Sequence, residues 1–233
     1  MTVRQGRRDP DAVLAAIPLF RGLAAHERAH LAECLRLRRY RRGQTIFTEG
    51  EPGRYLVILL RGQVKVVLST AEGDEAIVAL FGPGDFFGEM SLLDDQPRSA
   101  TVIALEPVEA LVLHRQDFRA FLREHVDAAE RILAVLAGHI RRLDNQLRRT
   151  YFLDLPGRLA QKLLELGTER GIRTAEGIQI NLPLTQSDLA GMVGASRQRV
   201  NRILSDWRQQ GIIRVDRRAV TILRPDYFQR QLV

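Results

Sequence analysis

The stretch LTQSDLAGMVGASRQRVNRIL, residues 184–204, decides the fold of the last third of the chain because it holds two helical patterns joined by a sharp turn. Thr185 is placed as the N-cap of the first helix, and Asp188 follows three residues later, as a capping box requires. Gly194 can adopt the positive φ of a tight turn, and Ser196 can cap the second helix. The stretch therefore predicts a helix–turn–helix.

The second of these helices has one apolar face and one polar face. The apolar side chains recur at helical spacing and are Val200, Ile203, Leu204 and Trp207. The opening turns project five polar side chains outward, namely Arg197, Gln198, Arg199, Asn201 and Arg202. Arginine can donate to guanine O6 and N7, and an amide can pair with adenine, so this face suits a DNA major groove. An ordinary helical domain with surface arginines is the alternative.

Positive charge is concentrated in the same region. The net charge is +7, and residues 155–233 contain thirteen Lys/Arg and seven Asp/Glu, a balance of +6, which leaves +1 for the first 154 residues. A basic segment beside a nearly neutral one indicates nucleic-acid binding. The alternative is a solvated arginine-rich surface that reflects coding bias, since Lys65 and Lys162 are the only lysines.

The flanking residues complete a winged helix. FLDLPG, residues 152–157, leads into an amphipathic helical pattern that ends at Gly171, and IIRVDRRAVTIL, residues 212–223, has the pattern of a closing hairpin. A helix, a helix–turn–helix and a hairpin in this order predict a winged helix-turn-helix domain over residues 154–233.

The first half of the chain has a different pattern. After a helical lead-in over 11–38, residues 39–113 form short apolar runs separated by glycine-containing turns. Such runs are typical of an antiparallel barrel or sandwich. We therefore expect a mostly β domain over residues 1–125 and an α+β fold for the whole chain.

Residues 126–153, between the two domains, predict a long helix and a hinge. Apolar side chains spaced three, four, three and four residues apart run along it: Leu133, Leu136, Ile140, Leu143 and Leu147. This spacing is the seam of a coiled coil, and the arginines beside it keep the stripe narrow, so we expect a parallel homodimer through this helix. The alternative is that the seam packs against the β domain of its own chain.

FLDLPGRLAQKLLEL, residues 152–166, together with residues 184–204, strongly resembles the DNA-binding half of the Crp/Fnr family of bacterial transcription regulators, and the resemblance covers nearly the whole chain. It implies a homodimer that binds a palindromic operator in double-stranded DNA and contacts RNA polymerase. It also implies an N-terminal cyclic-nucleotide-binding domain with a β-roll or jelly-roll fold.

The resemblance assigns roles on the helix that begins at Ser196. It places three side chains at the base edges, namely Arg197, Gln198 and Arg202. Phosphate contacts are expected from Thr185, Ser196 and Arg199. The commonest cyclic-AMP receptor pattern has Glu where this chain has Gln198, which leaves the identity of one base in the half-site open.

The segment FGPGDFFGEMSLLDDQPRSATVIA, residues 81–104, carries groups suited to a phosphate. Arg98 offers a guanidinium fork, Ser99 a hydroxyl, and a short helix near Glu89 offers backbone N–H donors. The segment resembles the phosphate-binding cassette of cyclic-nucleotide-binding domains, in which the Glu position holds the ribose 2′-OH. We expect the ligand site to comprise Gly88, Glu89, Met90, Ser91, Arg98 and Ser99. The alternative is a structural Glu–Arg ion pair in a cassette that binds nothing.

The effector that the resemblance implies is cyclic AMP, and its adenine contact is the less regular part of the pattern. Cyclic-AMP receptors commonly contact the base with Thr followed by Ser or Asn, and counting back from residues 152–154 places Leu143 and Asp144 at these positions. Leu143 cannot hydrogen-bond, although it fits the seam. Asp144 or Asn145 could meet an adenine amino group, and guanine or another nucleotide stays open.

Composition disfavours other chemistries. Cys34 is the only cysteine, which excludes an intrachain disulfide and an iron–sulfur or zinc site built on several thiolates of one chain. Isolated histidines are weak evidence for a haem site. No nucleophile–base pair, metal constellation or Walker loop points to an enzyme. No run approaches the roughly 18 apolar residues of a membrane helix, so we expect a cytosolic protein without a cofactor, a metal or a membrane partner.

The sequence is also compatible with two rival functions. One is a ligand-independent DNA-binding regulator with a degenerate pocket. The other is a cyclic-nucleotide-binding regulatory subunit of an enzyme, against which the basic helix–turn–helix argues.

Overall fold

The computed structural model describes residues 14–15, 17, 20, 22–69, 75–181, 184–216 and 219–230. The chain divides into two compact units, one of residues up to 68 with 79–140 and the other of residues 69–78 with 141–233. The fold is α+β, which confirms the prediction. Among the described residues, no helix has the length and apolar character needed to cross a bilayer.

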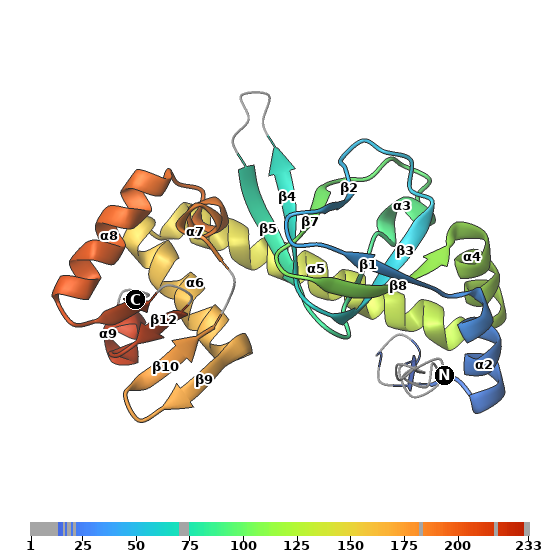
Figure 1. Ribbon diagram of the computed structural model, residues 1–233. Coiled ribbons are helices and arrows are strands. Elements are labelled where there is room, and N and C mark those ends of the chain that lie inside the picture. The colour runs from blue at the N-terminus through green and yellow to red at the C-terminus, as the bar shows by residue number, and fades with distance from the viewer. Residues whose placement is uncertain are drawn as a thin grey trace. The chain divides into compact units, whose positions relative to one another are not determined.

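Two of the sheets, each of four described strands, are built from residues 36–114 (Figure 1). The first sheet has the order β1 (Arg36–Tyr40), β8 (Val108–His114), β3 (Tyr55–Arg61) and β6 (Phe86–Phe87). The second has the order β2 (Thr45–Phe47), β7 (Thr101–Ala104), β4 (Val64–Ser69) and β5 (Glu75–Phe81). The pairings described within them are antiparallel, as the short runs and glycine turns predict.

Strand β3 is buried on both faces, and alternate residues join different cores. Leu56 and Ile58 belong to a cluster with the helices of this unit, whereas Val57 and Leu59 belong to the cluster between the two sheets. This division follows from the period of two in a strand, which points successive side chains to opposite faces. The strand that leads from the loop at Gly53 into the sheet is therefore firmly fixed.

The described helices near these sheets are α2 (Ala25–Cys34), α3 (Met90–Leu93), α4 (Arg115–Glu124) and α5 (Val126–Phe152). The buried cluster that contains Leu56 also holds side chains from three of these helices: Leu31 of α2, Phe118 and Phe121 of α4, and Ile132 of α5. Helix α4 therefore packs on the sheet, and only His125 separates it from α5.

The predicted seam lies on α5. Leu136 is half-buried and packs against the core of its own unit. The other four side chains of the seam are each more than half exposed: Leu133, Ile140, Leu143 and Leu147. The stripe is thus covered in part by its own chain and is otherwise open to solvent in the single chain.

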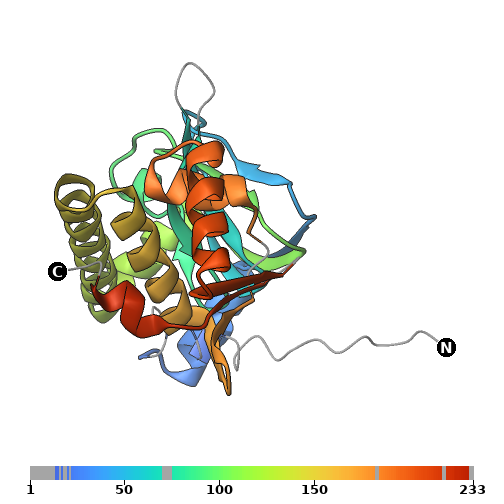
Figure 2. The same cartoon turned by 90° about the vertical axis from the view of Figure 1, so that its left-hand side faces the viewer.

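The second unit contains the helices and strands of a winged helix in the predicted order. Its helices are α6 (Leu155–Arg170), α7 (Gln186–Val193), α8 (Arg197–Gln209) and α9 (Pro225–Arg230). Its strands form an antiparallel sheet in the order β11 (Ile213–Asp216), β12 (Ala219–Ile222), β10 (Gly177–Ile180) and β9 (Gly171–Thr174). Helices α6, α7 and α8 lie on one side of this sheet (Figure 2).

The core of this unit holds α8 in place. Val200, Leu204 and Trp207 are buried on one face of the helix, and the Trp207 ring lies 4.7 Å from the Phe228 ring, centroid to centroid. The helix ends before Gly211, whose φ of 65° lets the chain turn into β11. The polar side of α8 is consequently fixed by packing on the opposite side.

Candidate ligand site and nucleic-acid interface

A tight backbone turn builds the predicted cassette. Gly88 follows β6 with a φ of 85°, and a Cβ at this position would lie only 2.6 Å from Nη1 of Arg98. A glycine is therefore required both for the left-handed conformation and for the close approach of the guanidinium. The short helix α3 begins two residues later, at Met90.

Arg98 is buried and held by the surrounding backbone. Its Nη1 donates to the Gly88 carbonyl at 2.8 Å, and its Nη2 donates to the Tyr55 carbonyl at 2.6 Å. The guanidinium also lies over the Phe47 ring, 4.0 Å from the centroid, which favours a cation. Burial nevertheless lowers the pKa of Arg98 from its usual value.

The Nε donor of Arg98 stays available. Its Nε is buried and has no hydrogen-bond partner among the residues that the structure describes. Among these described residues, the hydrogen bonds of the Arg98 guanidinium go to backbone carbonyls, and none goes to the Glu89 carboxylate. Because a buried donor without an acceptor is unfavourable, the site suits an anionic acceptor better than a closed Glu–Arg ion pair.

Glu89 is the second buried charge of the cassette, with 3% of its surface exposed. Burial raises its pKa above the usual range of a carboxyl group, against the opposing effects of a backbone hydrogen bond and of Arg98. Its Oε1 lies 3.8 Å from Nδ1 of His139 on α5. A hydroxyl donor from a ligand would compensate for part of this desolvation.

The remaining predicted cassette residues differ in their surroundings. Ser99 is exposed, with its Oγ 4.0 Å from Sδ of Met90, and Met90 is nearly half exposed. Ser91 is buried, and its hydroxyl donates to the Pro97 carbonyl at 3.2 Å. Ser91 therefore uses its side chain to hold the loop, and only its backbone remains a candidate for ligand contact.

Leu143 and Asp144 have exposed side chains on α5. They belong to the second unit, whereas the cassette belongs to the first, so their contact with a nucleotide base stays a prediction. No group of three or more His, Cys, Asp or Glu side chains suited to a metal occurs in the described ranges.

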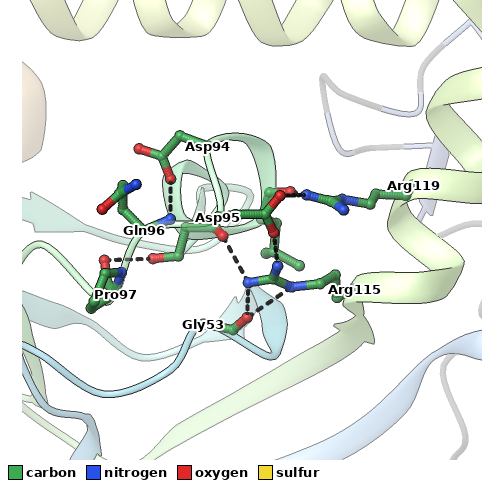
Figure 3. Close-up of polar contacts among 9 residues, drawn as sticks. Gly53, Asp94, Asp95, Gln96, Pro97, Arg115 and Arg119 are labelled. Carbon is green, nitrogen blue, oxygen red and sulfur yellow. Dashed lines mark hydrogen bonds and ion pairs between the residues drawn. The ribbon is translucent and has the colours of Figure 1, made fainter.

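Several residues that surround the cassette could not be identified from the sequence. Phe47, Tyr55 and His139 contact Arg98 or Glu89 from segments distant in the chain. Arg115 and Arg119 of α4 bind Asp95 in the loop after α3 (Figure 3). An arginine four residues after another on a helix indicates a shared face, but nothing local reveals which loop it meets.

The N-terminal caps of the helix–turn–helix are those that the sequence predicts. Thr185 Oγ1 accepts from the Asp188 N–H at 3.1 Å, and the Asp188 carboxylate accepts from the Thr185 N–H at 2.8 Å. Gly194 has a φ of 63°, and Ser196 Oγ accepts from the Arg199 N–H at 3.5 Å. The first two bonds fix where α7 begins, and the Ser196 bond fixes where α8 begins and therefore which side chains its first turns present.

Four of the five polar side chains predicted on the outer face of α8 are exposed: Arg197, Gln198, Arg199 and Arg202. Asn201 is the exception and corrects the prediction. It is half-buried, and its Oδ1 is buried without a hydrogen-bond partner among the described residues, because position 201 lies at the edge of the face that buries Val200 and Leu204.

The two units match two known domain families in order. Residues 37–125 match the cyclic nucleotide-binding domain, and residues 157–231 match the Crp-like helix-turn-helix domain. The chain is 35% identical over 212 residues to the CRP-like cAMP-activated global transcriptional regulator of Mycobacterium tuberculosis, covering 91% of this chain and 95% of the relative. It is 34% identical over 198 residues to the cyclic AMP receptor protein of Thermus thermophilus, covering 85% and 88%.

The structural comparison agrees with these matches. A transcriptional regulator of the CRP family from Thermus thermophilus superimposes with a TM-score of 0.71 at 26% identity, covering 84% of this chain and 96% of the other. The fold and its two sites define a DNA-binding transcription regulator that has a cyclic nucleotide-binding domain. The chain belongs to the Crp/Fnr family of transcription regulators.

Proposed function

We propose that this protein is a homodimeric regulator whose binding to a palindromic operator is controlled by a cyclic nucleotide, with cyclic AMP as the first candidate, and that it has no catalytic activity. The observation that carries the proposal is the buried Arg98, whose Nε has no partner among the described residues, beside the buried carboxylate of Glu89. The M. tuberculosis and T. thermophilus relatives, whose names refer to cAMP, support the same ligand.

The chemistry of the cassette favours a cyclic phosphate attached to a ribose. Arg98 supplies a desolvated cation, and an anion that reaches it forms a charge-assisted hydrogen bond in a site of low dielectric. Ser99 supplies an exposed hydroxyl one residue further on. Glu89 supplies an acceptor for a sugar hydroxyl. The residues therefore offer separate partners for the phosphate and for the ribose.

The dimer proposal rests on α5. Four apolar side chains at heptad spacing are exposed on this helix in the single chain: Leu133, Ile140, Leu143 and Leu147. A partner helix that buries such a stripe gains roughly 25 cal/mol for each Å² of apolar surface removed from water. A parallel pair of these helices also gives the two-fold symmetry that a palindromic operator requires.

Ligand control requires the two sites to be linked. The two copies of α8 in a dimer must lie about 34 Å apart to occupy successive major grooves, and one relative arrangement of the long helices α5 satisfies this. A ligand held by Glu89, Arg98 and Ser99 can favour this arrangement only by binding it more tightly than the alternatives. The bound dimer would then contact RNA polymerase at the promoter.

Calorimetric titration with cyclic AMP and cyclic GMP, with and without a saturating operator selected from random duplex DNA, tests the proposal. We expect the operator to tighten nucleotide binding by the same factor by which the nucleotide tightens operator binding, because coupling is reciprocal. Equal nucleotide affinity with and without operator would leave a regulator without ligand control. Nucleotide binding without any DNA binding would instead favour the regulatory subunit of an enzyme.

A further inference from the structure

The Asp95 carboxylate is held by two arginines of α4, as Figure 3 shows. Nη1 of Arg115 bonds to Oδ1, and Nη2 of Arg119 bonds to Oδ2 at 2.7 Å. Each arginine thus takes one oxygen of the same carboxylate. The hydrogen bond from Arg119 lowers the pKa of Asp95 below its usual range.

The same arginines bind the backbone of the cassette. Arg115 Nη2 donates to the Ser91 carbonyl at 2.9 Å, and Arg119 Nε donates to the Leu92 carbonyl at 3.0 Å. Helix α3 has only four residues, so these carbonyls gain donors that the helix itself does not supply. Cations at a helix C-terminus are also favoured by the orientation of the peptide dipoles.

Arg115 also binds a third segment, the loop before β3. Its Nε donates to the Gly53 carbonyl at 3.0 Å, and its Nη2 bonds to the same oxygen. A side chain at Gly53 would collide with Cβ of Ser91, so this loop lies directly against α3. Two residues later the chain enters β3 at Tyr55, whose carbonyl accepts from Arg98. The arginines of α4 therefore hold both segments that position Arg98.

Asp95 itself has an unusual backbone conformation. Its φ is 60°, and it is the only residue other than glycine with a positive φ in the described part of the chain. Such a conformation is unfavourable for a side-chain-bearing residue, although Asp tolerates it better than most. The turn reverses the chain after α3, three residues before Arg98 and four before Ser99. Contacts that hold this turn consequently determine where the phosphate-binding side chains lie.

We infer that Asp95, Arg115 and Arg119 form a positioning group that holds the cassette in its ligand-binding shape and sets nucleotide affinity without touching the nucleotide. The inference rests on the proposed ligand-binding function. Helix α4 is followed by α5 after a single residue, so the group also joins the cassette to the start of the long helix. A set of exposed ion pairs with no role in binding is the alternative, because such pairs contribute little on their own.

Asp95→Asn is the test variant, because Asn tolerates a positive φ and has the same shape but lacks the charge. We expect its affinity for cyclic AMP to fall about tenfold, since two charge-assisted bonds become neutral ones. We also expect faster amide hydrogen exchange over residues 91–99 in the ligand-free protein and little change in melting temperature. The last two readouts separate loosening of this loop from a general loss of stability.

Asp94→Asn is the matched control. Asp94 is exposed, and its Oδ1 accepts from the Gln96 N–H at 3.0 Å, a bond that an Asn side chain can keep. This control should bind cyclic AMP and exchange like the wild type. Combining Asp95→Asn with Arg119→Gln should weaken binding by less than the product of the two single effects, because both remove the same bond.

The outcomes separate the two proposals. If the wild type binds cyclic AMP and Asp95→Asn binds equally well, the positioning role is overturned while the proposed function stands. If the wild type binds neither cyclic AMP nor cyclic GMP, the proposed function fails. Hydrogen exchange of the ligand-free proteins then decides alone, and equal exchange over 91–99 in Asp95→Asn and wild type overturns the positioning role.

Discussion

The cassette and helix α8 both present charged groups for an anionic partner, but they keep these groups in opposite surroundings. Glu89 and Arg98 are each 3% exposed, and Arg98 is fixed by two carbonyls and an aromatic ring. Arg197 and Arg202 on α8 are exposed to solvent. A charge in the cassette is therefore desolvated before any ligand arrives, whereas a charge on α8 loses its water only when DNA binds.

This difference predicts different responses to substitution. A change at a buried charge should alter both the stability of the free protein and its ligand affinity, since the same interactions serve both. A change on the exposed face of α8 should alter DNA affinity and leave the stability of the free protein within about 0.5 kcal/mol. Added salt should also weaken DNA binding by α8 strongly and nucleotide binding by the cassette only weakly.

Arg98→Leu gives the largest expected effect. It removes the cation from a desolvated site and leaves the Gly88 and Tyr55 carbonyls without their donors, so nucleotide binding should weaken by about 3–5 kcal/mol. Arg98→Lys is the control, because it keeps the charge but cannot donate in fork geometry, and it should retain part of the affinity. Calorimetry with cyclic AMP and thermal melting measure both consequences. Unchanged affinity in Arg98→Leu would remove the cassette assignment.

Ile140→Asp tests a third kind of surface, the exposed apolar stripe of α5. If the stripe is covered by a second chain, the new carboxylate meets its symmetry mate in the interface and should weaken the dimer by roughly 3 kcal/mol. Ala134→Asp is the control, since Ala134 is exposed on the same helix but outside the heptad spacing. Light scattering over a concentration series measures the shift towards monomer. A dimer as tight as the wild type would place the interface elsewhere.

Arg197→Ala and Arg202→Ala test the exposed side of the comparison. Each should weaken operator binding by about 1–3 kcal/mol and relax one base position, while the melting temperature of the free protein stays the same. Arg199→Ala should mainly reduce the dependence of binding on salt, with a slope lower by about one. Binding to operator variants at several salt concentrations separates these roles. Equal weakening of all sequences by Arg197→Ala would assign that residue to the phosphate backbone.

The two regions also differ in how far the sequence could predict them. The caps at Thr185 and Ser196 and the turn at Gly194 depend on residues at most three apart, so local pattern was sufficient. Burial on α8 followed from periodicity, except at Asn201, predicted exposed, and Ile203, predicted buried. Both are half-buried, because the edges of the buried face could not be fixed to within one residue.

The cassette was predicted by residue type but not by contact. The hydrogen bond from Arg98 to the Tyr55 carbonyl depends on a segment 43 residues away in the chain. The partners of Asp95 lie 20 and 24 residues away from it. Such pairs are set by which elements pack together, and neither spacing nor composition specifies this packing. The same holds for Ser91, whose hydroxyl is used by its own loop.

The smallest expected effect is a dependence of stability on pH, and it distinguishes the two regions most directly. Burial raises the pKa of Glu89, so ionisation of this carboxyl opposes folding. The stability that the neutral carboxyl contributes is fully present below the ordinary carboxyl pKa, and it is lost as the pH rises through the raised pKa of the folded protein. Glu89→Gln should abolish this loss and stabilise the free protein at neutral pH by about 1.4 kcal/mol for each unit by which the folded and unfolded pKa values differ.

Glu89→Gln should at the same time weaken cyclic AMP binding, because an amide is a poorer acceptor for a ribose hydroxyl than a carboxylate. The measurement is the melting temperature of both proteins between pH 4 and 8, taken as a difference, so that groups unchanged by the substitution cancel. His139, 3.8 Å from Glu89, and Arg98 are the titratable and charged neighbours that could alter the curve, and His139→Gln in both backgrounds accounts for the first. A flat difference would mean that Glu89 ionises as an exposed carboxylate does. A variant that is more stable but binds less tightly would instead indicate that the buried carboxylate is kept for the ligand at the expense of the fold.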